Sequence, residues 1–178
     1  MRKEWYPFLA LVLVVVSTIV ISYFSSSNIS FSPTGLPSNI ICEDLECLIK
    51  CIKITETGGQ SNNGCDAIGD NGDSHGPYQI QQSMIDYAAR YDNNLSGIKA
   101  TDLSGKTGNL TCAQRISLSE KIMNANWGQS ATANTARKDR KWTCEDLARI
   151  HNGGPSGHTK KATLGYWDKV KECMAKKC

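Results

Sequence analysis

Four acidic side chains in the first half of the chain have types that suit general acid–base chemistry. Glu56 follows an apolar stretch, and the polar segment after it contains Asp66, Asp70 and Asp73. Hydrolysis of a glycosidic bond uses one carboxylic acid, which protonates the leaving oxygen, and a second carboxylate, which stabilises or traps the positively charged sugar. Partial burial against apolar side chains helps such an acid to keep its proton. Glu56 is therefore a candidate acid, and the competing interpretation is a solvated glutamate at a helix end.

The segment SHGPYQI contains residue types that bind sugars. Gly76 and Pro77 force a turn, and Tyr78 and Gln79 follow it. Sugar-binding clefts use aromatic faces and amide hydrogen bonds, which makes both of the latter residues candidates for substrate binding. The alternative is a structural turn that places the tyrosine in the core.

The segment ARIHNGGPSG places His151 and Asn152 directly before a Gly-Gly-Pro turn. A histidine at such a helix end is either a hydrogen-bonded structural residue or a titratable group that lines a site. Together with the neighbouring amide, it is a further candidate for substrate binding.

Helices must position these side chains, and apolar residues recur at helical spacing in five parts of the chain. We expect helices over residues 42–55, from Pro77 to Tyr91, from Thr111 to Trp127, from Thr143 to Asn152 and from Leu164 to Met174. Gly58 ends the first helix, so that Glu56 lies in its last turn. Thr143 is a good N-cap, and Asp146 completes a capping box. The predicted class is α+β, mostly α: a helical domain, stapled by disulfides, with a small polar loop or β-element over residues 57–76.

All eight cysteines lie beyond residue 41. An even number confined to this part predicts four disulfides in an oxidising compartment, with the pairing left open. Three glycosylation sequons, at Asn28, Asn94 and Asn109, fit the same compartment. The alternative, a metal site, is disfavoured because no Cys-x-x-Cys pairs recur and the histidines have unrelated spacings. We expect neither a metal nor another cofactor.

The N-terminal part predicts export from the cytosol. Arg2 and Lys3 precede an uncharged, mostly apolar run over residues 5–24. A basic start before an apolar run is typical of a secretory signal, and about 20 apolar residues also suffice to span a membrane. We expect residues 1–24 to be either a cleaved signal peptide or a single-pass signal anchor. The rest then lies outside the cytosol, secreted or tethered to the membrane.

Composition divides the remainder of the chain. Residues 25–40 are rich in Ser, Asn, Pro and Gly and predict a flexible tether, and residues 41–178 form the predicted domain. The chain has 20 basic and 17 acidic residues, and without Arg2, Lys3 and Glu4 it retains 18 and 16. This near-neutral balance argues against nucleic acid as a partner, since nucleic-acid binding requires a strong basic footprint.

Three motifs together resemble the invertebrate-type lysozymes, the family that includes the destabilases. They are GPYQI, TCEDLARIHNGGPSG and YWDKVKEC, in this order, and the resemblance covers about residues 42–173. It implies a lysozyme-like fold in which a glutamate at the end of the first helix is the acid. It also implies that the second carboxylate is the aspartate of an Asp-x-Gly segment. Glu56 and Asp70 match these two positions.

The chain also departs from the family pattern. It lacks four cysteines that members commonly have, and the corresponding positions hold Lys53, Gly59, His75 and His158. The loop between Asp70 and Gly76 is one residue shorter. Isopeptidase activity in the family is tied to a serine before GPYQI and a lysine after it. Ser74 matches the serine, but Gln81 stands in the place of the lysine and leaves no base to activate it.

The resemblance implies a muramidase that hydrolyses β-1,4 glycosidic bonds of bacterial peptidoglycan, for defence or for digestion. Two alternatives stay open: a glycan-binding or immune-recognition module that has lost catalytic geometry, and an isopeptidase. A chitin-like polymer also stays open as the substrate, as does the oligomeric state. The expected catalytic residues are Glu56 and Asp70, and the expected substrate-binding residues are Tyr78, Gln79, His151 and Asn152.

Overall fold

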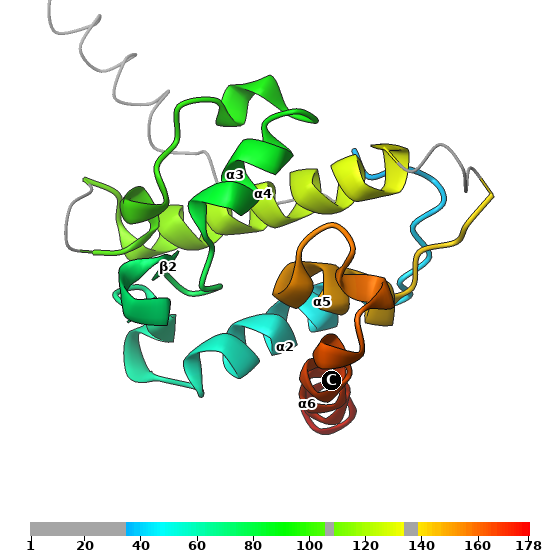
Figure 1. Cartoon of the computed structure of the whole chain (residues 1–178). Helices are drawn as coiled ribbons and strands as arrows, with labels where there is room; N and C mark the ends of the chain where they lie inside the picture. Colours follow the sequence, from blue (N-terminus) through cyan, green and yellow to red (C-terminus); the bar gives the residue numbers. More distant parts are fainter. Residues whose placement is uncertain (1–34, 106–108, 134–138) are drawn as a thin grey trace, which may run out of the picture. The chain divides into compact units, whose positions relative to one another are not determined.

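Helices account for most of the structure. The computed structural model describes residues 35–105, 109–133 and 139–178. Its elements, joined by loops and short 3-10 turns, are α2 (Leu45–Thr57), β1 (Ile68–Gly69), β2 (Ser74–His75), α3 (Gln82–Ala88), α4 (Cys112–Ala133), α5 (Cys144–Gly153) and α6 (Leu164–Lys177). The two strands form a small antiparallel sheet after the first of these helices. The predicted class, mostly helical with a small β-element, is confirmed (Figure 1).

Capping residues at both ends of helix α2 account for where it begins and ends. The N-cap residue Asp44 accepts a hydrogen bond from the backbone N–H of Cys47, at 2.9 Å. Leu48 and Ile52 are fully buried on one face. Gly58 adopts the left-handed conformation, with φ 61°, in which a residue without a Cβ ends a helix at little cost. Glu56 therefore lies in the last turn, as predicted.

Helix α3 begins later than the sequence predicted, at Gln82 and not at Pro77. His75 and Ile80 exchange two backbone hydrogen bonds, each of 3.0 Å, and form an isolated antiparallel bridge. The bridge closes residues 76–79 into a turn, so these residues cannot join a helix. The expectation that Pro77 lies in a first helical turn is wrong.

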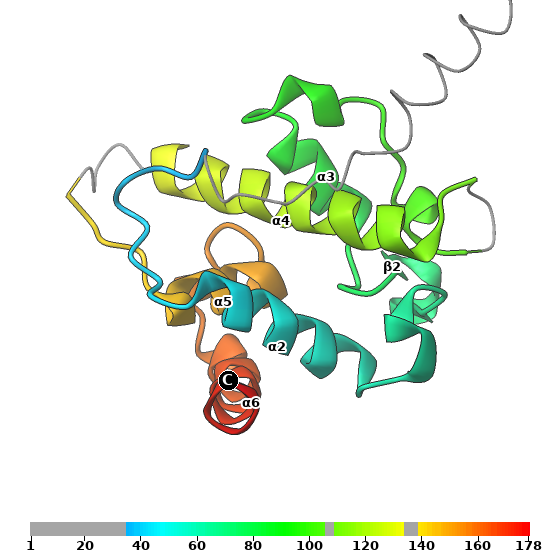
Figure 2. The same ribbon diagram turned by 180° about the vertical axis from the view of Figure 1, so that it is seen from behind.

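Helix α4 forms the middle of the fold. Figure 1 and Figure 2 both show α3 along one side of it and α2 and α5 on the other. Trp127 of α4 is fully buried, and its indole nitrogen donates to the carbonyl oxygen of Leu147 in α5, at 3.0 Å. A tryptophan packed in this way contributes a large apolar surface while its one polar atom stays satisfied.

Four disulfides tie the elements together. Three of them join the α2 region to α5 and to the C-terminal helix, and the fourth joins the polar loop to α4: Cys42–Cys144, Cys47–Cys178, Cys51–Cys173 and Cys65–Cys112. The predicted number is confirmed, and the structure supplies the pairing that the sequence left open. Such crosslinks fit an extracellular protein, because thiols stay reduced in the cytosol.

Some residues before position 41, the predicted start of the domain, already form hydrogen bonds with the folded part of the chain. Trp142 donates its backbone N–H to Asn39 and accepts one from Ile41, at 2.8 and 2.9 Å. The hydroxyl of Tyr91 donates to the carbonyl of Gly35. Residues 25–34 of the predicted tether lie outside the described residues.

The apolar run over residues 5–24, on which the expectation of a signal or anchor rests, also lies outside the described residues. Within residues 35–105, 109–133 and 139–178, none of the helices has the length and apolar character needed to cross a membrane.

Candidate active site

Glu56 is held at the end of α2 by side chains from two other helices. Its carboxyl oxygen Oε1 accepts a hydrogen bond from the hydroxyl of Tyr166 in α6, at 2.7 Å. The same oxygen lies 3.3 Å from Nε2 of His151 in α5. The side chain is 17% exposed, so it reaches solvent while most of it is covered. Oε2 has no hydrogen-bond partner in the described part of the chain, which leaves this oxygen available to a ligand.

Tyr166 is a permanent donor to this carboxyl group. Burial raises the pKa of the Tyr166 hydroxyl far above its ordinary value, and the negative charge of Glu56 and the hydrogen bond to it raise that pKa further. The phenol is therefore protonated at neutral pH and can donate to the carboxyl group. The Glu56 carboxyl group is thus anchored by one oxygen whatever its own protonation state.

Asp70 is presented by the loop between the two short strands. Asp70 and Asn71 both adopt left-handed backbone conformations, with φ 48° and 57°, which Asp and Asn tolerate better than most residues do. The carboxyl oxygen Oδ2 accepts hydrogen bonds from the Ser74 hydroxyl, at 2.5 Å, and from the Gln81 amide nitrogen, at 3.1 Å. Among the described residues, Oδ1 has no such partner. Asp70, like Glu56, is therefore held by one oxygen.

Both carboxyl groups face the same cleft. It has a volume of about 740 Å³, and its walls come from α2, the strand loop, α3, α4 and the turn after α5. The lining includes Glu56, Asp70, Ser74, Gln79, Gln81, Met84, Tyr87, Arg90, Asn126, His151, Asn152 and Lys160. The tertiary structure thus brings together five of the six residues that the sequence singled out for catalysis and binding.

Tyr78 is the exception, and the expectation that its side chain lines the cleft is wrong. Its ring is fully buried and its hydroxyl donates to Glu120 of α4, at 2.5 Å. Burial, together with the charge of Glu120, raises the pKa of Tyr78 far above its ordinary value. The turn closed by the His75–Ile80 bridge directs this ring into the core, so that it supports the site without reaching a ligand.

Gln79 and Asn152 both line the cleft. Gln79 has a left-handed backbone, with φ 48°, and its amide nitrogen donates to the carbonyl of Gly76 at 2.9 Å. Gly69 makes room for this side chain, since a Cβ there would lie 2.2 Å from its Oε1. Asn152 is exposed at the end of α5.

The other two aspartates of the loop point elsewhere. Asp66 forms an ion pair with Arg115 of α4, at 2.9 Å, next to the Cys65–Cys112 disulfide. Asp73 is exposed and is absent from the cleft lining. Of the three candidate second carboxylates, only Asp70 therefore shares the cleft with Glu56.

The two histidines that stand in the place of family cysteines are buried and packed. His75 Nδ1 lies 3.1 Å from the hydroxyl oxygen of Ser104. The ring of His158 meets the ring of Trp142 edge to face, with centroids 5.0 Å apart. These contacts hold the strand loop and the turn after α5 against the rest of the fold.

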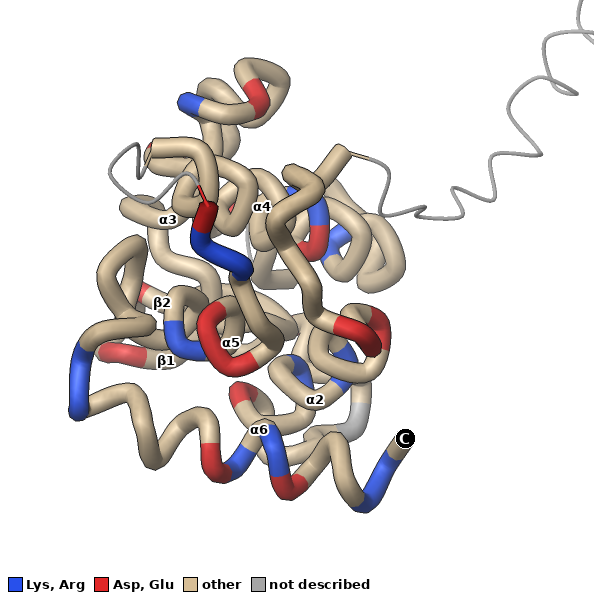
Figure 3. The backbone as a smooth tube through the Cα atoms, turned by 90° about the vertical axis from the view of Figure 1, so that its right-hand side faces the viewer, with Lys and Arg blue, Asp and Glu red and all other residues tan. Residues whose placement is uncertain are grey.

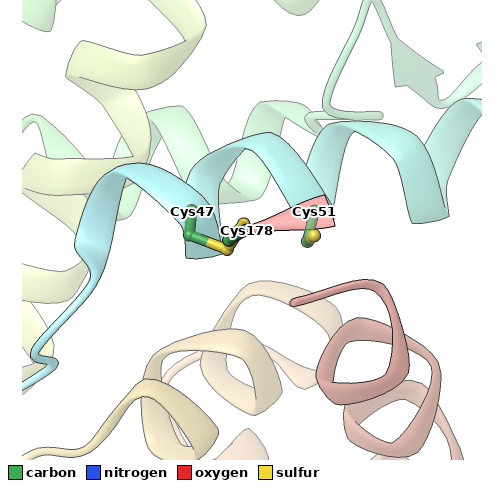
Figure 4. A group of neighbouring side chains, drawn as sticks. All are labelled: Cys47, Cys51 and Cys178. Carbon is green, nitrogen blue, oxygen red and sulfur yellow. A yellow bond between two sulfur atoms is a disulfide. The ribbon is translucent and has the colours of Figure 1, made fainter. Parts of the chain in front are cut away.

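A cluster of three sulfurs lies outside the cleft. Figure 4 shows Cys47 and Cys51 on α2 with Cys178 beside them, and the three sulfur atoms lie within 4.8 Å of one another. All three belong to disulfides, so none is a thiolate that could bind a metal ion.

Figure 3 shows acidic and basic positions interspersed along α6, so this helix carries charges of both signs.

Sequence reasoning missed several residues of the site. Tyr166 lies within the motif YWDKVKEC, but nothing in its spacing pointed to the first helix. Asn126 lies on α4, to which no site residue was assigned. Met84, Tyr87 and Arg90 of the α3 region form one wall. Their apolar spacing predicted a helix, yet the sequence did not show which positions would face the cleft.

Curated proteins that are similar to this chain are named as lysozymes. The chain is similar to invertebrate-type lysozyme 3 of Caenorhabditis elegans, with 39% identity over 74 residues, which is 42% of each chain. It is also similar to lysozyme 1 of Crassostrea virginica, with 32% identity over 151 residues, which covers 82% of this chain and 65% of the relative. The chain thus spans less than two thirds of the length of these curated relatives.

The family model described as Destabilase matches residues 44–173, which is most of the chain. The match spans every element that lines the cleft, from α2 to the turn after α5. It also confirms the resemblance that the three motifs indicated. The chain therefore belongs to the destabilase family, that of the invertebrate-type lysozymes.

Proposed function

We propose that this protein is a lysozyme, a glycoside hydrolase that cleaves the β-1,4 bonds between the amino sugars of bacterial peptidoglycan. The observation that carries the proposal is that Glu56 and Asp70 face one cleft, each held through a single oxygen. The names of the relatives, invertebrate-type lysozyme and lysozyme, support the same activity.

Glu56 is the general acid of this proposal. Tyr166 and His151 hold Oε1, so the proton is delivered from Oε2 to the oxygen of the leaving sugar. The hydrogen bond from Tyr166 fixes the orientation of the carboxyl group before the substrate arrives, which is where much of the catalytic advantage of a positioned acid lies.

Asp70 is the second carboxylate. The charge that develops on the sugar ring needs an anion nearby, and the exposed Asp70 carboxylate supplies it from the strand loop. Ser74 and Gln81 hold Oδ2 and leave Oδ1 for the reacting carbon or for a water molecule. Gln79, His151 and Asn152 line the rest of the cleft as the binding residues.

The proposal extends to location and target. The apolar run over residues 5–24 directs the chain out of the cytosol, as a cleaved signal or as an anchor, and bacterial wall is then the accessible polymer. Four disulfides suit that compartment.

Glu56→Gln tests the proposal against the alternative of a non-catalytic glycan-binding module. The substitution should lower the rate of wall lysis at least about 100-fold, because general acid catalysis contributes about that much or more. Glu46→Gln is the matched control, since Glu46 is an exposed glutamate of the same helix. Binding to insoluble wall should persist in both variants. A wild-type protein that binds wall without releasing reducing sugars would contradict the hydrolase and favour the binding module.

A further inference from the structure

The chain contains three Asn-Gly pairs, the kind of pair in which an asparagine loses its amide group most readily. They are Asn63-Gly64, Asn71-Gly72 and Asn152-Gly153. In this reaction the backbone nitrogen of the following residue attacks the side-chain carbonyl carbon of the asparagine. Glycine obstructs that approach least, because it has no Cβ and adopts most backbone conformations. The surroundings of the three pairs differ, and these differences decide which of them can react.

Both residues of the pair Asn71-Gly72 are exposed, in the loop that joins β1 to β2. Gly72 has φ 110°, and apart from its chain neighbours no atom of the described chain lies within 4 Å of the position that a Cβ would occupy. A backbone hydrogen bond of 3.2 Å, from the N–H of Asp73 to the carbonyl oxygen of Asp70, spans the pair. The rest of the fold therefore does not obstruct the backbone rotation that brings the Gly72 nitrogen to the Asn71 side chain.

The other two pairs are held in place. In the first, Gly64 is buried, and a Cβ on it would lie 2.1 Å from Cγ2 of Thr57. In the last, Asn152 and Gly153 belong to the final turn of α5, and a Cβ on Gly153 would lie 2.6 Å from Cγ2 of Thr163. The hydrogen-bond ladder of an α-helix fixes each backbone nitrogen, so the Gly153 nitrogen reaches the Asn152 side chain only if this turn unwinds.

We propose that Asn71 is a site of spontaneous deamidation, with water as the co-reactant. The nitrogen of Gly72 forms a bond to Cγ of Asn71, the bond from Cγ to Nδ2 breaks, and ammonia leaves with the proton of the Gly72 N–H. Water then opens the resulting succinimide ring at one of its two carbonyl carbons, which yields either aspartate or isoaspartate. Both products carry a carboxylate where the amide was. In isoaspartate, the main chain runs through the former side chain and gains a methylene group.

Deamidation at this position alters the loop that presents Asp70. The new negative charge stands directly after Asp70 in the sequence. In the isoaspartate form, the longer main chain lies inside the turn that the Asp73–Asp70 hydrogen bond closes, and it moves Asp70 away from Ser74 and Gln81, which hold Oδ2. A shift of about 1 Å in a reacting group can cost on the order of 100-fold in rate. The effect on activity rests on the proposed function, because it takes Asp70 as the second carboxylate.

The experiment incubates the purified full chain in mildly alkaline buffer, which speeds ring closure by removing the proton from the attacking nitrogen. Digestion and mass spectrometry of samples taken over time locate each replacement of an NH group by oxygen and each isoaspartate. We expect Asn71 to convert at least about tenfold faster than Asn63 or Asn152, because the latter two pairs must first open locally. These two asparagines are the matched controls within the same chain.

A substitution links the modification to activity. Asn71→Gly removes the amide and tolerates the left-handed backbone of this position, with φ 57°. Wall lysis by wild type should decline as isoaspartate accumulates, whereas this variant should keep its starting rate through the same incubation. Asn63→Gly, at a position with φ 51°, should decline as wild type does. If Asn71→Gly does not fold, Asn71→Asp takes its place, since a carboxylate reacts far more slowly than an amide with the Gly72 nitrogen.

The outcomes separate the modification site from the proposed function. Conversion of Asn63 or Asn152 as fast as that of Asn71 would overturn the proposal, and so would an unmodified Asn71 under conditions that convert a linear peptide of residues 68–75. A lysis rate that stays constant while Asn71 converts would overturn the link to activity. Mass spectrometry needs no turnover, so a chain that converts at Asn71 but never lyses wall would refute the hydrolase and support the modification site.

Discussion

Nε2 of His151 lies 3.3 Å from Oε1 of Glu56 and 3.1 Å from the backbone carbonyl oxygen of Tyr78. Both neighbours are acceptors, so this ring nitrogen carries a proton in order to satisfy them. His151 is 6% exposed and therefore has little freedom to leave this position. The imidazole of His151, at the end of α5, thus contacts both the end of α2 and the GPYQI turn. Both of these segments are far from His151 in the sequence.

The hydroxyl of Tyr166 should be needed for full activity. Tyr166→Phe removes one of the two groups that hold Oε1 of Glu56, and a hydrogen bond to a carboxyl group of this kind is worth about tenfold in rate when it fixes a reacting group. We expect kcat for wall lysis to fall about tenfold while wall binding stays the same. Tyr91→Phe is the control, because the Tyr91 hydroxyl donates to Gly35 and not to a residue of the cleft. Equal rates in wild type and Tyr166→Phe would contradict the positioning role.

Asp70 should be the aspartate on which lysis depends. Asp70→Asn removes the negative charge from the cleft, and we expect a loss of at least about 100-fold in the rate of wall lysis. Asp73→Asn and Asp66→Asn should keep most of the activity, since Asp73 is exposed and Asp66 pairs with Arg115. The loss of lysis in either of the latter variants, with activity retained in Asp70→Asn, would reverse the assignment.

Stability should fall above pH 10. Burial raises the pKa of both Tyr78 and Tyr166 in the folded protein, whereas in the unfolded chain a tyrosine ionises near pH 10. Above that pH the unfolded state has fewer bound protons than the native state, so the free energy of unfolding decreases as pH rises. Each of the two tyrosines should contribute about 1.4 kcal/mol per pH unit.

Urea unfolding at pH 9 and at successive higher pH values measures this dependence. The Tyr78→Phe variant removes one ionisable group and should therefore show a shallower decline than wild type. A slope that is identical in the two proteins would show that Tyr78 does not remain protonated in the folded state.

The protein should lack isopeptidase activity. The hydroxyl of Ser74 donates to Asp70 and also lies 3.3 Å from the amide nitrogen of Gln81, so no strong base accepts its proton. A glutamine amide cannot act as that base at neutral pH. Incubation with a γ-glutamyl-lysine peptide should release no free lysine side chain. Cleavage that disappears in Ser74→Ala would show that the serine is activated after all.

Local patterns in the sequence determined the boundaries of several elements and the position of Glu56 in the last turn of α2. Thr143 and Asp146 form the predicted capping box of α5, and Gly58 ends α2 directly after the turn that holds Glu56. These features depend on contacts between groups three or four residues apart, so a short sequence pattern includes all the residues involved. The even number of cysteines likewise predicted four disulfides but not their pairing, because pairing depends on which helices pack together.

Only the tertiary structure decided which side chains meet in the cleft. Tyr166 reaches Glu56 across 110 positions of sequence, and α4 contributes Asn126 to the cleft lining. The direction of Tyr78 depended on the bridge between His75 and Ile80, which turned the ring toward Glu120 and into the core. Such placements follow from the packing of several elements at once, and the helical period of each element alone does not contain that information.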